Sequence, residues 1–535
     1  MLRGNGRAPI NRMLPTYLAS RRWFRDKSRR IRSTTVVDVI EVPPAAGGDE
    51  RSPGHFVVVD VQLDQGLPER YVLAVAHATS DEAEEICKWR PESVMCDIRS
   101  ADGDGVLYDA LTLTPFTRAL VELMGRRRHL TGHRGRLESL PTRSLRRMRD
   151  GIDAETQGAP ISTEQSNTSV VIGNRVVVKV IRRVEEGLNP DVEVSGFLTE
   201  SARFPHAPKL GGSIDYRPDG DEPAATIAVA QEFVANEGDG WSYVLDALTR
   251  VLEEVITLPA AEELRMPVSA DPLTAADMTP PRDHPLVGPH LHWAEMLGRR
   301  TGELHLALAS SQTDEAFTPE PFTAVDRRSL HHGAKSLLRR SMRAVRAMPE
   351  ASEYVRELIE RQPEIRSRLE AAMQLPITAR KIRCHGDYHL GQVLWTGKDF
   401  MIIDFEGEPA RPLSSRRLKR PPLVDVAGMI RSFHYASRVA SGRLSRDLTL
   451  GDERARLDPL TTLWYRSITG AFLRSYLESA SDGGFLPSSR EELAALLDFM
   501  LLEKAIYELG YEADNRPTWV DVPARGLLDL LGEPS

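Results

Sequence analysis

The sequence has few cysteines and no long apolar run. Its 535 residues hold three cysteines, Cys87, Cys96 and Cys384, and their spacing matches neither a zinc site nor a disulfide framework. No stretch of about twenty apolar residues occurs, so no membrane span is expected. The arginine-rich start lacks the apolar segment of a secretory signal. These absences predict a protein of the reducing cytoplasm.

Positive charge is also in deficit. Lysine and arginine number 69 against 77 acidic residues, which gives a net charge of −8 and argues against nucleic acid as a general partner. The composition, 41% hydrophobic and 27% charged, is ordinary for a globular protein that builds packed cores. The length exceeds that of one compact domain, so roughly two to four structural units are expected.

The first part of the chain predicts a β-rich cap, residues 1–125. Segments 34–42, 55–63 and 70–77 are alternating or β-branched and are separated by glycine, proline and aspartate, which predicts a small antiparallel sheet. Residues 105–124 show apolar positions that favour an amphipathic helix. Nothing in this cap predicts catalysis.

Residues 126–236 show the pattern of a nucleotide-binding lobe. Two strand-like runs, 164–172 and 175–180, flank a Gly-Asn turn. In kinases such a hairpin covers the ATP phosphates, and its second strand carries a lysine to them, which is the position of Lys179. The glycine-rich G-x-G-x-x-G loop is missing. Phosphate contacts would therefore come from hydroxyl, amide and backbone groups of Ser166, Asn167, Thr168 and Ser169.

A helix is expected to begin after Asn189, with that residue as its cap and a proline at its first position. This start predicts that Glu193 pairs with Lys179, although an ordinary surface pair is the alternative. The apolar strand 224–234 takes the place of the segment that binds adenine, with contacts predicted for Gln231 and Phe233. The basic runs 126–128 and 143–149 favour a solvated surface over a phosphate-binding patch.

Residues 382–409 carry the catalytic prediction. The pattern is a loop, a short strand, a tight turn, a second strand and an acidic end. Asp387, in His-Gly-Asp, would accept the proton of a substrate hydroxyl. Gln392 and Asp404 would hold Mg²⁺ against the phosphates of ATP, as in the kinase template H-R-D-x-x-x-x-N followed by a metal-binding aspartate. A plain hairpin with an acidic turn is the alternative.

Residues 237–535 predict a mainly helical lobe. His305 is expected to pack in the core rather than to act in catalysis. Asp425 either caps a helix or braces the catalytic loop, and the sequence leaves both open. Near the end, one helical face carries aromatic rings and carboxylates that suit a sugar, and the alternative is a tyrosine-rich core helix with exposed glutamates. Its members are Tyr507, Glu508, Tyr511 and Glu512. Other helices are predicted at 241–254, 292–309, 329–345 and 350–373.

Several motifs occur together and identify a family resemblance. They are Arg22-Trp23-Phe24-x-x-Lys27, Glu164 to Ser169, Gln231-Glu232-Phe233, Gly238-Asp239-Gly240-Trp241, His385 to Gln392, Asp404 to Pro409, Asp425-Val426-Ala427-Gly428 and residues 503–519. In this combination the chain resembles the bacterial maltokinases over nearly its whole length. It departs from them at Arg25, where the family commonly has glycine, which affects only details of the cap.

The resemblance implies a fold and a reaction. The fold is α+β and bilobal, protein-kinase-like, with an antiparallel β cap, a nucleotide lobe and a helical C-lobe at 237–535. The reaction is ATP-dependent phosphorylation of maltose at its anomeric hydroxyl, with Mg²⁺, giving maltose 1-phosphate and ADP. The family serves trehalose and α-glucan (glycogen) metabolism, which implies trehalose synthase as a partner. His389 and Glu406, within the matching motifs, are further predicted sugar contacts.

Two other functions stay open from the sequence. A related cap-bearing kinase would phosphorylate glucosamine or an aminoglycoside, but such relatives tend to have Asp-Phe-Asp where this chain has Asp404-Phe405-Glu406. A pseudokinase that only binds its ligand is disfavoured, because Lys179, Asp387 and Asp404 are all present.

Overall fold

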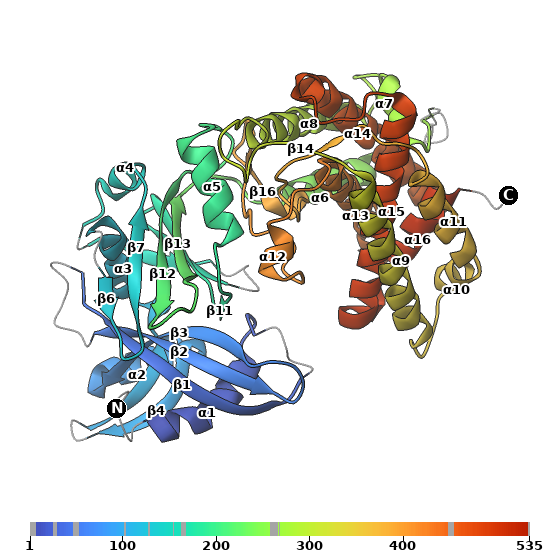
Figure 1. The fold of residues 1–535 in the computed structure, drawn as a ribbon. Coiled ribbons are helices and arrows are strands. Elements are labelled where there is room, and N and C mark those ends of the chain that lie inside the picture. The colour runs from blue at the N-terminus through green and yellow to red at the C-terminus, as the bar shows by residue number, and fades with distance from the viewer. Residues whose placement is uncertain are drawn as a thin grey trace. The chain divides into compact units, whose positions relative to one another are not determined.

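The chain folds into two compact units, which are visible in the computed structural model (Figure 1). The first comprises Met1–Arg203 and Pro208–Ala235, and the second comprises Phe204–Ala207 and Asn236–Ser535. The predicted cap and nucleotide lobe thus both lie in the first unit. The structure describes residues 7–24, 29–45, 53–100, 103–126, 129–153, 155–161, 167–256, 266, 268–447 and 454–532.

The first sheet of unit 1 is antiparallel and includes the three strands expected in the cap. Successive side chains of a strand point to opposite faces, so Val57 and Val59 join one core with helix α1 (Arg7–Ser20), whereas Phe56 and Val58 join another. The strand order is β1-β2-β3-β5-β4, and β11 pairs with β3. The strands are β1 (Ile31–Val42), β2 (Gly54–Leu63), β3 (Glu69–Thr79), β4 (Val94–Ser100), β5 (Gly103–Asp109) and β11 (Arg183–Val184).

The helix predicted for 105–124 is wrong in its first part. Strand β5 continues to Asp109, and helix α3 (Thr114–Arg126) begins only afterwards. Strand β5 pairs with both β3 and β4. Successive side chains of a strand point to opposite faces, and Val106 and Leu107 are buried in the cores on the two faces of the sheet. A strand that is covered on both faces needs no polar alternation, so its pattern resembles that of a helix.

The second sheet of unit 1 carries the nucleotide hairpin. Helix α5 (Pro190–Glu200) packs on β12, and α3 and α4 (Leu145–Arg149) contact each other and β12. The order is β6-β7-β12-β13-β10-β9-β8. The strands are β6 (His129–Thr131), β7 (Gly135–Pro141), β8 (Gly158–Pro160), β9 (Thr168–Ile172), β10 (Val176–Val180), β12 (Leu210–Pro218) and β13 (Ala225–Glu232), and α2 (Ser80–Trp89) contacts the first sheet.

Unit 2 is mainly helical, as expected. None of the described helices combines the length and apolar character that a membrane crossing needs. The helices are α6 (Gly240–Ile256), α7 (Pro272–Asp277), α8 (Gly288–Leu308), α9 (Ala324–Arg346), α10 (Glu353–Glu360), α11 (Gln362–Ala372), α12 (Leu413–Arg416), α13 (Leu423–Asp447), α14 (Arg454–Ala480), α15 (Arg490–Asn515) and α16 (Asp521–Leu531). Two small hairpins accompany them, β14 (Glu320–Pro321) with β15 (Arg380–Lys381) and β16 (Val393–Trp395) with β17 (Phe400–Ile402).

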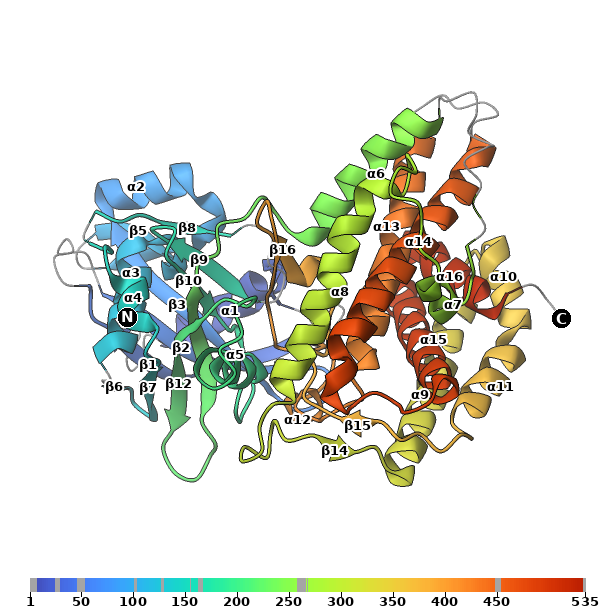
Figure 2. The ribbon, with the colours of Figure 1, turned by 90° about the horizontal axis from the view of Figure 1, so that it is seen from above.

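Helices α8 and α14 lie side by side in unit 2 (Figure 2). Gly298 and Gly302 of α8 face α14, and a Cβ atom at either position would overlap Phe472 or Ser479 of that helix. The two glycines therefore allow a close approach of the helices.

Candidate active site

The predicted catalytic loop of unit 2, residues 385–392, is held by Asp425, in the first turn of α13. Its two carboxylate oxygens accept hydrogen bonds from the backbone N–H groups of His385 (2.8 Å) and Gly386 (2.9 Å). The side chain is 1% exposed. Burial alone would raise the pKa of Asp425, but its hydrogen bonds and the nearby histidines His305 and His385 hold that pKa below its usual value. Of the two roles left open for Asp425, the structure therefore supports bracing of the catalytic loop.

His305 stands behind Asp425 and is fully buried. Its Nε2 lies 3.1 Å from Asp425 Oδ2, and its Nδ1 lies 3.1 Å from the hydroxyl of Tyr476 on α14. The expectation that His305 packs in the core is confirmed. Both ring nitrogens are engaged, so the histidine fixes the orientation of the carboxylate that holds the loop.

The hairpin after the loop places Asp404 as the sequence predicts. Strands β16 and β17 pair in register from Val393↔Ile402 to Trp395↔Phe400, and Asp404 follows them with φ 65°. Such a left-handed conformation is uncommon for a residue other than glycine and is typical of functional sites. Gln392 Nε2 donates a hydrogen bond to Asp404 Oδ2 over 3.0 Å, so the two predicted metal ligands are brought together.

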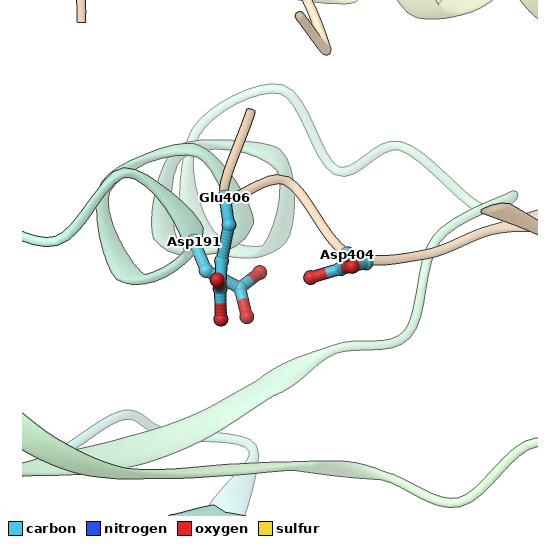
Figure 3. A group of neighbouring side chains, drawn as sticks. All are labelled: Asp191, Asp404 and Glu406. Carbon is cyan, nitrogen blue, oxygen red and sulfur yellow. The ribbon is translucent and has the colours of Figure 1, made fainter. Parts of the chain in front are cut away.

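Glu406 follows Asp404 on the segment that leaves β17 (Figure 3). It is 7% exposed, and its backbone oxygen accepts a hydrogen bond from Arg416 (3.3 Å). A carboxylate this well buried lies where a metal ion or a fixed hydrogen-bonding partner suits it better than bulk solvent.

Asp387 lies beside a lysine that the sequence analysis did not select. Lys504 of α15 places its Nζ 3.5 Å from Asp387 Oδ1 and 3.8 Å from Glu408 Oε2. Burial would lower the pKa of Lys504, but the carboxylates of Asp387, Glu408 and Glu508 outweigh it and raise that pKa. For Glu408, burial and the charge of Asp387 raise the pKa in spite of Lys504.

Lys504 and Glu408 had detectable signals in the sequence. Lys504 precedes Tyr507 by three residues and therefore lies on the same helical face as the predicted sugar contacts. Glu408 belongs to the acidic motif after Asp404. Neither position matches the protein-kinase template, which is why both were missed.

His389 lies next to Asp387, as the prediction of a substrate contact requires. Its Nε2 is 4.0 Å from Asp387 Oδ2, and its Nδ1 accepts a hydrogen bond from the N–H of Gly391 over 3.0 Å. The ring is thus oriented by the loop itself, with one nitrogen toward the proposed base.

The aromatic and acidic face of α15 divides into two parts. The rings of Tyr507 and Tyr511 stack with centroids 6.3 Å apart. Glu508 forms an ion pair of 2.9 Å with the buried Arg431. Glu512 is 2% exposed and pairs with Arg516 at 2.7 Å. The alternative of a core helix predicted that both glutamates are exposed, and neither is. The burial of Glu512 favours a structural role over contact with a sugar.

In unit 1, Lys179 lies on β10 and is almost fully buried. Its Nζ is 3.6 Å from Oδ2 of Asp191, which is fully buried. Asp191 lies in the first turn of α5 (Figure 3), where its N–H donates to the side chain of Asn189 over 2.8 Å. The predicted cap is therefore confirmed. Asp191, one position after the helix-starting proline, is thus a carboxylate partner of Lys179 that the sequence analysis did not select. The pairing of Glu193 with Lys179 stays a prediction.

The two predicted adenine contacts are engaged within unit 1. Gln231 donates from Nε2 to Asp191 Oδ1 (3.2 Å) and so supports the carboxylate that pairs with Lys179. The N–H of Phe233 donates to the backbone oxygen of Arg175 over 2.9 Å. These bonds use the Gln231 side chain and the Phe233 N–H for internal structure.

The hairpin residues predicted to contact phosphate are largely internal. The Thr168 hydroxyl accepts a hydrogen bond from Nε of the buried Arg182 over 2.9 Å. Ser169 is 1% exposed and Asn167 is 8% exposed. Ser166 lies outside the described residues. The backbone of the hairpin is thus the part best suited to approach a nucleotide.

Comparison with known proteins finds two family matches. Residues 273–459 match the phosphotransferase enzyme family, and residues 17–112 match the maltokinase N-terminal cap domain. A glucosamine kinase of Mycolicibacterium smegmatis is 26% identical over 70% of this chain and 79% of its own length. A glucosamine kinase of Streptacidiphilus jiangxiensis is 25% identical over 71% of this chain and 76% of its own length.

A solved structure shows the same fold. It is a glucosamine kinase in complex with glucosamine, ADP and inorganic phosphate, with a TM-score of 0.58 and 19% identity over 92% of this chain and 94% of that chain. A second crystal form of a glucosamine kinase gives a TM-score of 0.59 at 20% identity, over 92% of this chain and 94% of that chain. The predicted α+β fold, with antiparallel sheets followed by a mainly helical region, is confirmed as kinase-like.

Proposed function

We propose that this phosphotransferase, which joins a maltokinase-type cap to a kinase-like catalytic region, transfers the γ-phosphoryl group of ATP to the anomeric hydroxyl of maltose. The products would be maltose 1-phosphate and ADP. The observation that carries the proposal is the braced loop that presents Asp387 to Lys504 and lies next to the pair Gln392 and Asp404. The cap match supports maltose, and trehalose synthase is the corresponding partner.

Asp387 is the proposed catalytic base. Its carboxylate would accept the proton of the attacking hydroxyl and hold that oxygen in line with the γ-phosphate. Lys504 places its Nζ 3.5 Å from Asp387 Oδ1 and would help to hold the carboxylate in position. His389, on the other side of the carboxylate, is a candidate donor to a sugar hydroxyl.

Gln392 and Asp404 are the proposed Mg²⁺ ligands. The side-chain N–H of Gln392 donates a hydrogen bond to Asp404. Its amide oxygen is therefore the atom that could face a cation. A carboxylate and an amide oxygen are the hard donors that Mg²⁺ prefers. When bound, the ion neutralises charge on the phosphates during transfer. The residues present therefore fit this metal.

The charge balance of α15 supports a neutral sugar as acceptor. Each of its carboxylates near the proposed site pairs with an arginine: Glu508 with Arg431 and Glu512 with Arg516, both described above, and Glu503 with Arg420 at 2.9 Å. An ammonium group would have to compete with these guanidinium groups. The stacked rings of Tyr507 and Tyr511 suit the C–H face of a sugar ring instead.

Glucosamine is the second candidate acceptor. The curated relatives are named glucosamine kinases, and Glu408 offers a specific attraction for an amine. Burial and then the charge of Asp387 raise the pKa of Glu408, and an ammonium group placed beside this carboxylate would favour its ionised form. This candidate keeps the catalytic roles and changes only the acceptor.

The deciding experiment measures ADP release from Mg-ATP with maltose, glucose, glucosamine or water as acceptor. Turnover with maltose, together with loss of the reducing end, supports anomeric phosphorylation. Turnover with glucosamine alone moves the enzyme to the second candidate. Equal ADP release in water and with every sugar contradicts both, because the site would then not select an acceptor hydroxyl.

A further inference from the structure

Unit 1 contains a cavity that none of the roles described so far uses. It has a volume of about 500 Å³ and lies between α3, α4 and the segment 150–153 that follows α4. This volume is within the range of small-molecule sites, about 300–1,000 Å³. None of its lining residues is among the proposed catalytic, metal-binding or nucleotide-binding residues.

Three arginines line the cavity. Arg118 of α3 is 5% exposed, Arg149 is half-buried, and Arg146 is exposed at the rim. Among the described residues, no carboxylate lies within ion-pair distance of Arg146 or Arg149. A half-buried guanidinium without a counter-ion is unusual, because removing a charge from water is costly unless it is paired.

Two of the acidic residues along the cavity are already engaged. Glu122 pairs with Arg126 at 2.8 Å. The Asp153 carboxylate accepts the Thr156 hydroxyl at 2.8 Å and the Thr156 N–H at 2.9 Å. Asp150 is the exposed third acid at the rim. The Thr156 groups are neutral, so Asp153 keeps its charge, and three arginines face two carboxylates, Asp150 and Asp153, that no cation balances among the described residues.

We propose that this cavity binds a small phosphorylated molecule. The guanidinium groups of Arg146 and Arg149 would hold the phosphate, since their planar fork matches two phosphate oxygens at once. The apolar part of the ligand would lie against the remaining walls, which include Val121, Leu145 and Ile152. The basic run 143–149 would then divide into residues that face the cavity and residues that only face solvent.

A glycine of α3 fixes the position of Arg149. The guanidinium of Arg149 rests so close to Gly125 that a Cβ atom there would overlap it. The overlapping atoms are the end of a flexible side chain, so a methyl group at this position should displace the guanidinium without disturbing the backbone. Gly125→Ala is therefore a substitution that moves one charge and removes none.

The test is isothermal titration calorimetry of the full-length protein with phenyl phosphate and, separately, with inorganic phosphate, in the absence of Mg²⁺. The wild type should bind phenyl phosphate more tightly than inorganic phosphate, because only the former contacts the apolar walls. The double variant Arg146→Gln/Arg149→Gln should weaken phenyl phosphate binding about tenfold or more. Gly125→Ala should weaken it in the same direction.

The matched control removes two charges from the same basic run. Arg143 and Arg147 are exposed and do not line the cavity, so Arg143→Gln/Arg147→Gln should bind as the wild type does. Equal weakening by both double variants would show simple surface-charge attraction and overturn the proposal. So would unchanged binding in the Arg146/Arg149 variant, no preference for phenyl phosphate, or no binding at all. If the ligand bound at the predicted catalytic centre instead of this cavity, none of these variants would change its affinity.

Discussion

In both the predicted catalytic loop of unit 2 and the predicted nucleotide hairpin of unit 1, a buried charged side chain holds the segment by hydrogen bonds. The two segments differ in whether their backbone or a side chain is bound. Buried Asp425 holds the loop through two backbone N–H groups, and buried Arg182 holds the hairpin through Thr168. In the loop, the side chain of Asp387 remains directed at Lys504 of α15. In the hairpin, Thr168 itself is the anchor. A side chain that anchors a segment is not available to bind the substrate. Asp425 binds only backbone groups of the loop, whereas Arg182 binds the side chain of Thr168.

The largest expected effect is in the loop. Asp387→Asn keeps the size of the side chain but removes the proposed base, and turnover should fall about 10²–10⁴-fold. Steady-state kinetics check this result, with melting temperature and ATP affinity as controls that should stay near those of the wild type. A variant that retains a tenth or more of wild-type turnover would contradict the role of Asp387.

The brace of the loop should matter for stability as well as for rate. Asp425→Ala leaves the N–H groups of His385 and Gly386 without acceptors and His305 without its carboxylate, which should cost about 3 kcal/mol. Urea unfolding measures this loss. Asp425→Asn, which keeps an acceptor oxygen, is the matched control and should lose less. A cost below about 1 kcal/mol for the alanine variant would mean that the loop holds itself in place.

The hairpin side of the comparison is tested by two neighbouring carboxylates. Asp191→Asn removes the charge of a buried partner of Lys179, so the KM for ATP should rise about tenfold, the equivalent of one charged contact. Glu193→Gln should change it about twofold or less. Kinetics at saturating sugar separate the two. The reverse order of effects would identify Glu193 as the functional partner of Lys179.

The smallest effect concerns pH and Glu408. Its pKa is raised in the folded protein by burial and by Asp387, so the folded state holds this proton more tightly than the unfolded chain does. Stability should therefore fall as the pH rises from the ordinary value of 4.5 through the raised pKa. Glu408→Gln should remove that fall.

Melting temperatures at pH 4.5 and 7.5 provide the measurement for Glu408. The wild type should lose more stability between the two pH values than the glutamine variant. An identical pH dependence would show that Lys504 fully balances Glu408, and it would weaken the case for glucosamine as acceptor.

Local signals made most of the catalytic loop predictable. His385, Asp387, Gln392 and Asp404 lie within twenty residues of one another, and a hairpin with a fixed register converts that spacing into proximity. The start of α5 was predictable for the same reason, because a cap and a proline are adjacent in the chain.

Contacts between distant segments could not be predicted in this way. Lys504 meets Asp387 only because α15 packs in the same unit, and no spacing in the chain encodes that meeting. Strand β5 was mistaken for a helix because burial on both faces erases the alternation that distinguishes a strand. The contact of Asp191 with Lys179 likewise joins α5 to β10, and it depends on how the helix packs against the sheet rather than on any spacing in the chain.

The glycines of α8 have a consequence for the tolerance of the enzyme to mutation. Gly298 and Gly302 set the spacing to α14, and the next turn of α8 carries His305, which reaches both Tyr476 and Asp425. A methyl group at either glycine would act as a wedge that tilts this histidine away from its carboxylate. Gly298 and Gly302, which are far in the sequence from the loop, thus influence its alignment through His305 and Asp425. At Gly298 the overlap is with backbone atoms of Phe472, so substitutions there should lower stability together with activity.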